Sequence, residues 1–132
     1  MEGFFNADGS LTPNAISAYR PLREGELDRA DALAQALSFA AFNGQLDAVD
    51  VLLARGADPD RLTPGFLWPG DRGANALHRA VRGDRAHIVR RLLEVGADPS
   101  IHDLNWDSKP GDWAGYFAGK EVADLLAEVG DD

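Results

Sequence analysis

The feature that most constrains this chain is an internal repeat. The segment from Leu52 to Asp60 recurs, with a few substitutions, as the segment from Leu92 to Ser100. A shorter third copy begins at Leu125, and another recurring segment lies upstream of each copy. Self-similarity at a period of roughly 20–50 residues is typical of stacked repeat architectures. The spacing is uneven, and the additional residues fall between the first two copies.

Each copy predicts two short antiparallel helices. In the second copy Leu77, Ala80 and Val81 lie on one helical face, and another apolar face follows downstream. Gly56 and Gly96 can adopt the positive φ that ends a helix, and a proline follows each of them. A helix pair of this length cannot bury its own apolar face, so the units must stack. The sequence therefore predicts a helical solenoid.

The run from Ala76 to Val81, followed by the leucine pair and Gly-Ala-Asp-Pro at residues 92–99, resembles an ankyrin repeat. The resemblance extends over roughly residues 33–130 and implies an all-α solenoid with hairpin-like finger loops. It places the repeats at residues 33–73, 74–107 and 108–132. Residues 1–32 are expected to form an N-terminal capping segment, because the end of a repeat stack needs a cover.

Two departures from the family pattern concern local geometry. Asp84 occupies the position of the mid-repeat glycine in the second copy, which leaves the geometry of that turn open. In the last copy Gly111 and Asp112 replace the Leu-His pair of the family. We therefore expect the first helix of the last repeat to begin less firmly than the others.

Composition limits the possible partners and surroundings. The chain carries 13 basic and 22 acidic residues, a formal net charge of −9, and no cysteine. A surplus of acidic side chains opposes binding to phosphate backbones and to anionic membrane surfaces. No apolar run approaches the length of a membrane span, and there is no basic segment followed by an apolar one at the N-terminus. We expect a soluble cytoplasmic protein that binds neither nucleic acid nor membrane.

The histidines do not suggest a reactive centre. His78, His87 and His102 fall on three different parts of the repeat, whereas a zinc or catalytic site needs convergent groups. The family resemblance gives His78 a structural role, in which it bonds the backbone of a neighbouring turn. We therefore predict no catalytic residue, no metal and no cofactor, and a protein that is not an enzyme.

The additional residues between the first two copies form a lengthened first finger, residues 62–73, which contains Phe66 and Trp68. Two interpretations are open for these aromatic residues. They fold back over the first helices as additional core, or they present an apolar tip to a partner. The second finger, residues 102–108, has a normal length and carries Trp106.

In this family the residues just before the mid-repeat break face outward on the first helices. Here they include Phe42, Arg82, Tyr116 and Phe117, and Arg79 lies one helical turn before Arg82. Aromatic residues and arginine are enriched at interface hot spots, which favours a binding surface. Alternatively, the two phenylalanines are buried beneath the fingers.

Five of the basic residues lie in the second repeat: Arg79, Arg82, Arg85, Arg90 and Arg91. A basic stripe of this kind could receive an acidic peptide through bidentate pairing. Equally, acidic residues on neighbouring repeats could neutralise it within the molecule, through Asp47, Asp50 and Asp124.

These observations predict a non-catalytic module that binds a protein partner through its concave finger and first-helix surface. The predicted contacts are Phe42, Arg79, Arg82, Tyr116, Phe117, Trp106 and Trp68. The alternative is an acidic inhibitor or immunity-type protein that blocks a basic enzyme or a nucleic-acid-binding site. A homodimer through the C-terminal repeat is also possible, because apolar residues recur there at Val122, Leu125 and Val129.

Overall fold

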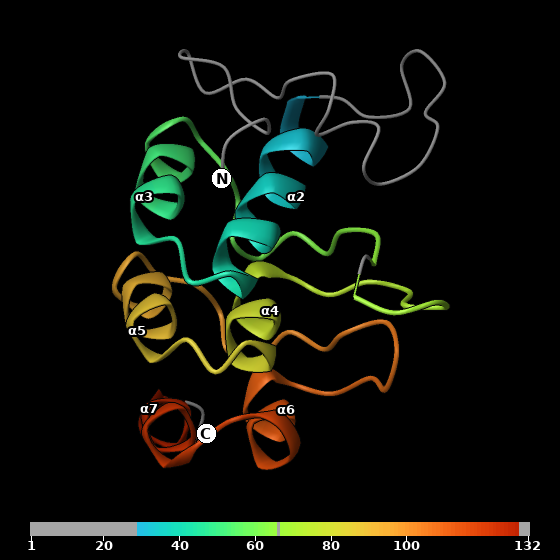
Figure 1. Ribbon diagram of the computed structural model, residues 1–132, viewed down its shortest axis with the longest axis vertical. Helices are drawn as coiled ribbons and strands as arrows, with labels where there is room; N and C mark the ends of the chain where they lie inside the picture. Colours follow the sequence, from blue (N-terminus) through green and yellow to red (C-terminus); the bar gives the residue numbers. More distant parts are fainter. Residues whose placement is uncertain (1–28, 66, 130–132) are drawn as a thin grey trace.

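The computed structural model describes residues 29–65 and 67–129, which form six helices and no β-strand. The helices are α2 (Arg29–Phe42), α3 (Leu46–Ala54), α4 (Ala76–Arg82), α5 (Ala86–Glu94), α6 (Pro110–Phe117) and α7 (Lys120–Val129). They stand in two columns, with α2, α4 and α6 in one and α3, α5 and α7 in the other (Figure 1). Both fingers extend from the column of first helices (Figure 1). This arrangement confirms the all-α helical repeat.

The helix α2 is continuous from Arg29 to Phe42. No residue in this range breaks a helix, and its alanine-rich face packs against α3 and α4. The predicted capping segment, residues 1–32, lies almost wholly outside the described residues. Its last four residues form the beginning of α2.

The mid-repeat turns keep one geometry in the first two repeats. Gly44 has φ of 72°, and Asp84, at the equivalent position, has φ of 55°. An aspartate tolerates this left-handed conformation better than most side chains do. The Oδ1 atom of Asp84 accepts a hydrogen bond from the Gly119 amide at 2.9 Å. The substitution therefore keeps the turn and adds a bond to the next repeat.

The second helices end as the glycines predict. Gly56 and Gly96 have φ of 95° and 94°, and the amide that follows each glycine bonds back into the last helical turn. The first helix of the third repeat, which lacks the Leu-His pair, begins with other residues. The helix α6 begins at Pro110, and the Lys109 amide donates to Oδ2 of Asp112 at 3.1 Å. This bond and the proline together define the start of α6.

The hydrophobic core lies between the two columns. Small residues of the first helices allow neighbouring helices to approach closely, and larger aliphatic residues of the second helices fill the space between the columns. The core includes Leu37, Ala40, Val49, Leu52, Leu77, Ala80, Ile88, Val89, Leu92, Trp113, Val122 and Leu126. Of the apolar residues that suggested a homodimer through the C-terminal repeat, Val122 is completely buried, Leu125 is half-buried and Val129 is 44% exposed.

Candidate protein-binding surface

The first finger is organised around the carboxylate of Asp71. Its Oδ2 atom accepts from the Leu67 amide at 3.2 Å, and its Oδ1 atom accepts from the Gly73 amide at 3.0 Å. The guanidinium of Arg79 donates to both oxygens, at 2.7 and 3.2 Å. Burial alone would raise the pKa of Asp71, but the hydrogen bonds from Arg79 and Asn105 outweigh it and hold the pKa below its ordinary value.

Arg79 is buried, contrary to the expectation from its helical register. We expected Arg79 on an exposed face beside Arg82, but its side chain is completely buried, as is that of Asp71. A buried guanidinium requires a charged and hydrogen-bonding partner, and the lengthened first finger supplies one. Arg79 therefore holds the first finger against α4.

The second finger is organised in the same manner around Asp103. One carboxylate oxygen accepts from the amides of Asn105 and Trp106, at 2.7 and 3.0 Å. The other accepts from the Ser108 amide at 2.8 Å and from the indole nitrogen of Trp113 at 3.2 Å. Burial raises the pKa of Asp103, but these donors outweigh it and the pKa lies below its ordinary value.

The two fingers are joined directly. The Leu104 amide donates to the Gly73 carbonyl at 3.0 Å. The side chain of Asn105 donates to Asp71 at 2.9 Å and accepts from the Arg72 amide at 2.7 Å. Because backbone and side chain both take part, these bonds join the two fingers into one surface.

His78 has the structural role implied by the family resemblance. Its Nε2 atom donates to the Ser108 carbonyl at 2.9 Å, and its Nδ1 atom accepts from the Asn75 amide at 3.4 Å. Asn75 also caps α4, since its side-chain oxygen accepts from the His78 amide at 3.0 Å. Burial of the imidazole lowers the pKa of His78 to about 4. His78 is therefore neutral at physiological pH.

This buried histidine predicts a loss of stability in mild acid. In the unfolded chain His78 takes up a proton below about pH 6.5, whereas in the folded chain it does so only near pH 4. The free energy of unfolding should therefore fall by about 2 kcal/mol between pH 7.5 and pH 5. Urea denaturation at a series of pH values measures this slope. The variant His78→Gln, which does not titrate, should be nearly insensitive to pH over the same interval.

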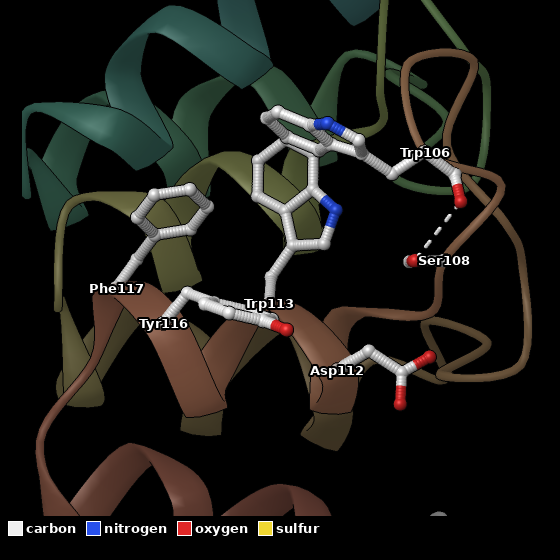
Figure 2. Close-up of a pocket in the computed structure, with 6 residues that line it drawn as sticks. All are labelled: Trp106, Ser108, Asp112, Trp113, Tyr116 and Phe117. Carbon is white, nitrogen blue, oxygen red and sulfur yellow. Dashed lines mark hydrogen bonds between the residues drawn. The ribbon is translucent and has the colours of Figure 1, made fainter.

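An aromatic cluster lies where the fingers meet α6. Trp113 is at its centre and is only 2% exposed. Three other rings surround it, with centroids at 6.4 Å for Trp68, 5.5 Å for Trp106 and 5.6 Å for Phe117. The neighbouring Tyr116 is 87% exposed, and Trp106 is 54% exposed. Figure 2 shows the rings of Trp106, Trp113, Tyr116 and Phe117 gathered between the second finger and α6. We name these four residues and Trp68 the aromatic cluster.

The remaining residues of the predicted site lie on the first finger, at the end of α2 and on α4. Trp68 is half-buried against the core, so its side chain packs on the molecule and remains partly exposed; Phe66 lies outside the described residues. Phe42 is half-buried at the end of α2. Arg82 is half-buried on α4, with its guanidinium carbon 4.6 Å from the centroid of the Phe117 ring.

The other arginines of the second repeat are largely engaged within the molecule. Arg91 pairs with Asp50 at 2.8 Å, and Arg90 pairs with Glu121 at 2.8 Å. Arg85 donates to the Phe42 carbonyl at 3.1 Å. Internal neutralisation is therefore the better of the two interpretations, although its acidic partners differ in part from those expected.

No helix in the part of the chain that the structure describes is long and apolar enough to cross a membrane. Within that part, no group of three or more histidine, aspartate or glutamate side chains is arranged to hold a metal ion.

Stacked helix pairs joined by fingers define a helical-repeat protein, and comparison with known families gives the family. A profile described as "Ankyrin repeats (3 copies)" matches residues 37–132. The chain belongs to the ankyrin-repeat family. Ankyrin repeats are in general modules for protein–protein interaction and are typically non-catalytic.

Individual relatives are much longer than this chain. The inactive serine/threonine-protein kinase TEX14 of Bos taurus is 32% identical over 117 residues, which are 87% of this chain and 7% of that protein. The palmitoyltransferases ZDHHC17 and ZDHHC13 of Homo sapiens are 36% and 37% identical over 67 residues, 51% of this chain and 10% of each protein. The chain thus spans a tenth or less of the length of these relatives.

Proposed function

We propose that this chain binds a protein partner through the concave surface formed by its fingers and first helices. The proposed contacts are Phe42, Arg82, Tyr116, Phe117, Trp106 and Trp68, which is the predicted set without the buried Arg79. The surface acts by presenting preformed contacts, so little conformational freedom is lost on binding.

The observation that carries this proposal is the exposure of Tyr116 beside Trp106. Tyrosine and tryptophan in such positions leave a large apolar area in water, and they are enriched among the residues that dominate binding energy. Both stand on ordered elements, Tyr116 on α6 and Trp106 on a finger held by Asp103. Aromatic residues fixed in this way are suited to anchor a partner.

The double variant Arg82→Ala/Tyr116→Ala tests the proposal. We expect it to weaken partner binding at least about tenfold, because interface aromatic and arginine side chains each contribute more than about 1 kcal/mol at hot spots. Affinity capture from a lysate of the native cells, followed by titration with the captured protein, measures the loss. Val51→Ala is the matched control, since Val51 is 48% exposed on α3, in the opposite column.

Two outcomes would contradict the proposal. A partner retained equally by the double variant and by the control would place the interface elsewhere. If capture weakens steeply as salt is added, and neither the double variant nor the control changes it, the acidic inhibitor is favoured instead. In that case the net charge of −9 supplies the attraction. Far-UV circular dichroism of each variant establishes that the fold is intact.

A further inference from the structure

A cavity of about 420 Å³ opens beside the aromatic cluster, between the second finger and α6. It is lined by Trp106, Ser108, Asp112, Trp113, Tyr116 and Phe117. The planes of Trp106 and Phe117 stand at 72° and 71° to that of Trp113. In Figure 2 these rings and Tyr116 border the cavity, and Asp112 lies at the end away from Phe117. Aromatic side chains therefore line one space from several directions, and the most exposed of them are Tyr116 and Trp106.

This combination of groups favours a positively charged ligand. The faces of tryptophan, tyrosine and phenylalanine carry negative quadrupole charge and attract cations. The cluster already binds one cation internally, because the guanidinium of Arg82 stands over the ring of Phe117. Asp112 adds a carboxylate that is exposed and that forms no ion pair among the described residues.

The lining also distinguishes between kinds of cation. A bare ammonium or guanidinium brings several N–H groups, each of which costs free energy if it is desolvated without an acceptor. The side-chain hydrogen-bond acceptors that line this cavity are confined to Ser108, Asp112 and the Tyr116 hydroxyl, and the remaining lining is aromatic. An alkylated ammonium has few or no N–H groups, so aromatic faces can replace its water without leaving donors unsatisfied.

We propose that this cavity binds the alkylated ammonium group of a methylated lysine, carried by a basic segment of the partner protein. The proposal rests on the proposed function and names the chemistry of the partner. The basic segment follows from charge complementarity, since a chain with a net charge of −9 attracts cationic sequences and repels acidic ones. The side chain enters between Trp106 and Tyr116, and Asp112 faces its charge.

Two matched peptides test the charge requirement. The first is a lysine- and arginine-rich peptide with one trimethyl-lysine, and the second carries its neutral isostere, with a tert-butyl group in place of trimethylammonium. By isothermal titration calorimetry we expect the cationic peptide to bind at least about tenfold tighter. Unmodified lysine at the same position should bind more weakly than trimethyl-lysine. Equal binding of the cationic and neutral peptides would overturn the proposal and identify a pocket for an uncharged apolar side chain.

Variants of the protein locate the binding. Tyr116→Ala should abolish the preference for the cationic peptide, and Tyr116→Phe should retain it. Leu104→Ala is the matched control, because Leu104 is 50% exposed on the same finger and does not line the cavity. A preference that survives Tyr116→Ala would overturn the proposed location.

Two small molecules separate a peptide ligand from a free one. Choline and its uncharged analogue 3,3-dimethylbutan-1-ol differ in the same charged group, and ligand-observed nuclear magnetic resonance detects weak binding of each. We expect choline to bind at least about tenfold more weakly than the peptide. Choline binding as tightly as the peptide would overturn the proposal in favour of a small-molecule site, and no binding of any cation at millimolar concentration would overturn it outright.

The proposed function can stand when this inference fails. If the double variant Arg82→Ala/Tyr116→Ala loses its partner while the cationic and neutral peptides bind equally, the surface binds a protein by other chemistry. If that variant retains its partner while the peptide preference is observed, the cavity is a separate site.

Discussion

Arg79→Met is expected to lower the free energy of unfolding by about 3–5 kcal/mol, because it leaves the carboxylate of Asp71 buried without its cation. Both side chains are completely buried, and Asp71 holds the first finger through two backbone amides. The first finger should therefore lose its order together with the global stability. Urea denaturation measures the free energy, and amide hydrogen exchange at Leu67 and Gly73 measures the order of the finger.

The matched control for this prediction is Arg91→Met in the same repeat. The pair of Arg91 and Asp50 is partly exposed, and pairs of that kind contribute little to stability. We expect Arg91→Met to be nearly neutral. In the double variant Arg79→Met/Asp71→Asn the uncompensated charge is removed, so the loss should be smaller than the sum of the single losses. Equal effects of Arg79→Met and Arg91→Met would contradict the assigned role of Arg79.

Trp113→Ala is the second substitution with a large expected effect, a loss of about 3–5 kcal/mol. Trp113 is buried, packs against His78 and the rest of the aromatic cluster, and donates to Asp103. Its removal leaves a cavity and takes one donor from the carboxylate that organises the second finger. Thermal and urea denaturation measure the loss.

The control for this substitution is Trp106→Ala, which removes a side chain of the same type that is about half exposed. We expect it to cost clearly less stability than Trp113→Ala. Trp113→Phe should give an intermediate loss of stability, because a smaller aromatic ring still fills part of the site but cannot donate a hydrogen bond to Asp103. Equal losses of stability for Trp106→Ala and Trp113→Ala would contradict the prediction that the buried Trp113 contributes more than the half-exposed Trp106.

The repeat architecture could be predicted because its signals are local. Apolar spacing defines the helices, and the glycines at 56 and 96 end them in the predicted conformation. The role of His78 followed from the family resemblance, and the structure confirms it through the bond to Ser108. The exposure of Tyr116 agrees with its register on the first helix.

The arrangement of the fingers could not be predicted, because it depends on contacts between distant residues. Neither Asp71 nor Asp103 was identified as an organising carboxylate, although each is followed two residues later by an amide that it binds. That spacing is an Asx-turn signal and could have indicated them. Arg79 was misplaced because its burial requires the lengthened finger to fold back over α4. Helical periodicity contains no information about this folding.

All three tryptophans of the chain belong to the aromatic cluster. The tryptophan fluorescence of the protein therefore originates where the two fingers meet α6, and the helices α2 to α5 contribute no indole signal. Far-UV circular dichroism, by contrast, averages over all the helices. An emission change that precedes the loss of ellipticity on heating would identify detachment of the C-terminal repeat while the preceding repeats remain folded. The native chain thus carries a local optical probe for the end of its stack.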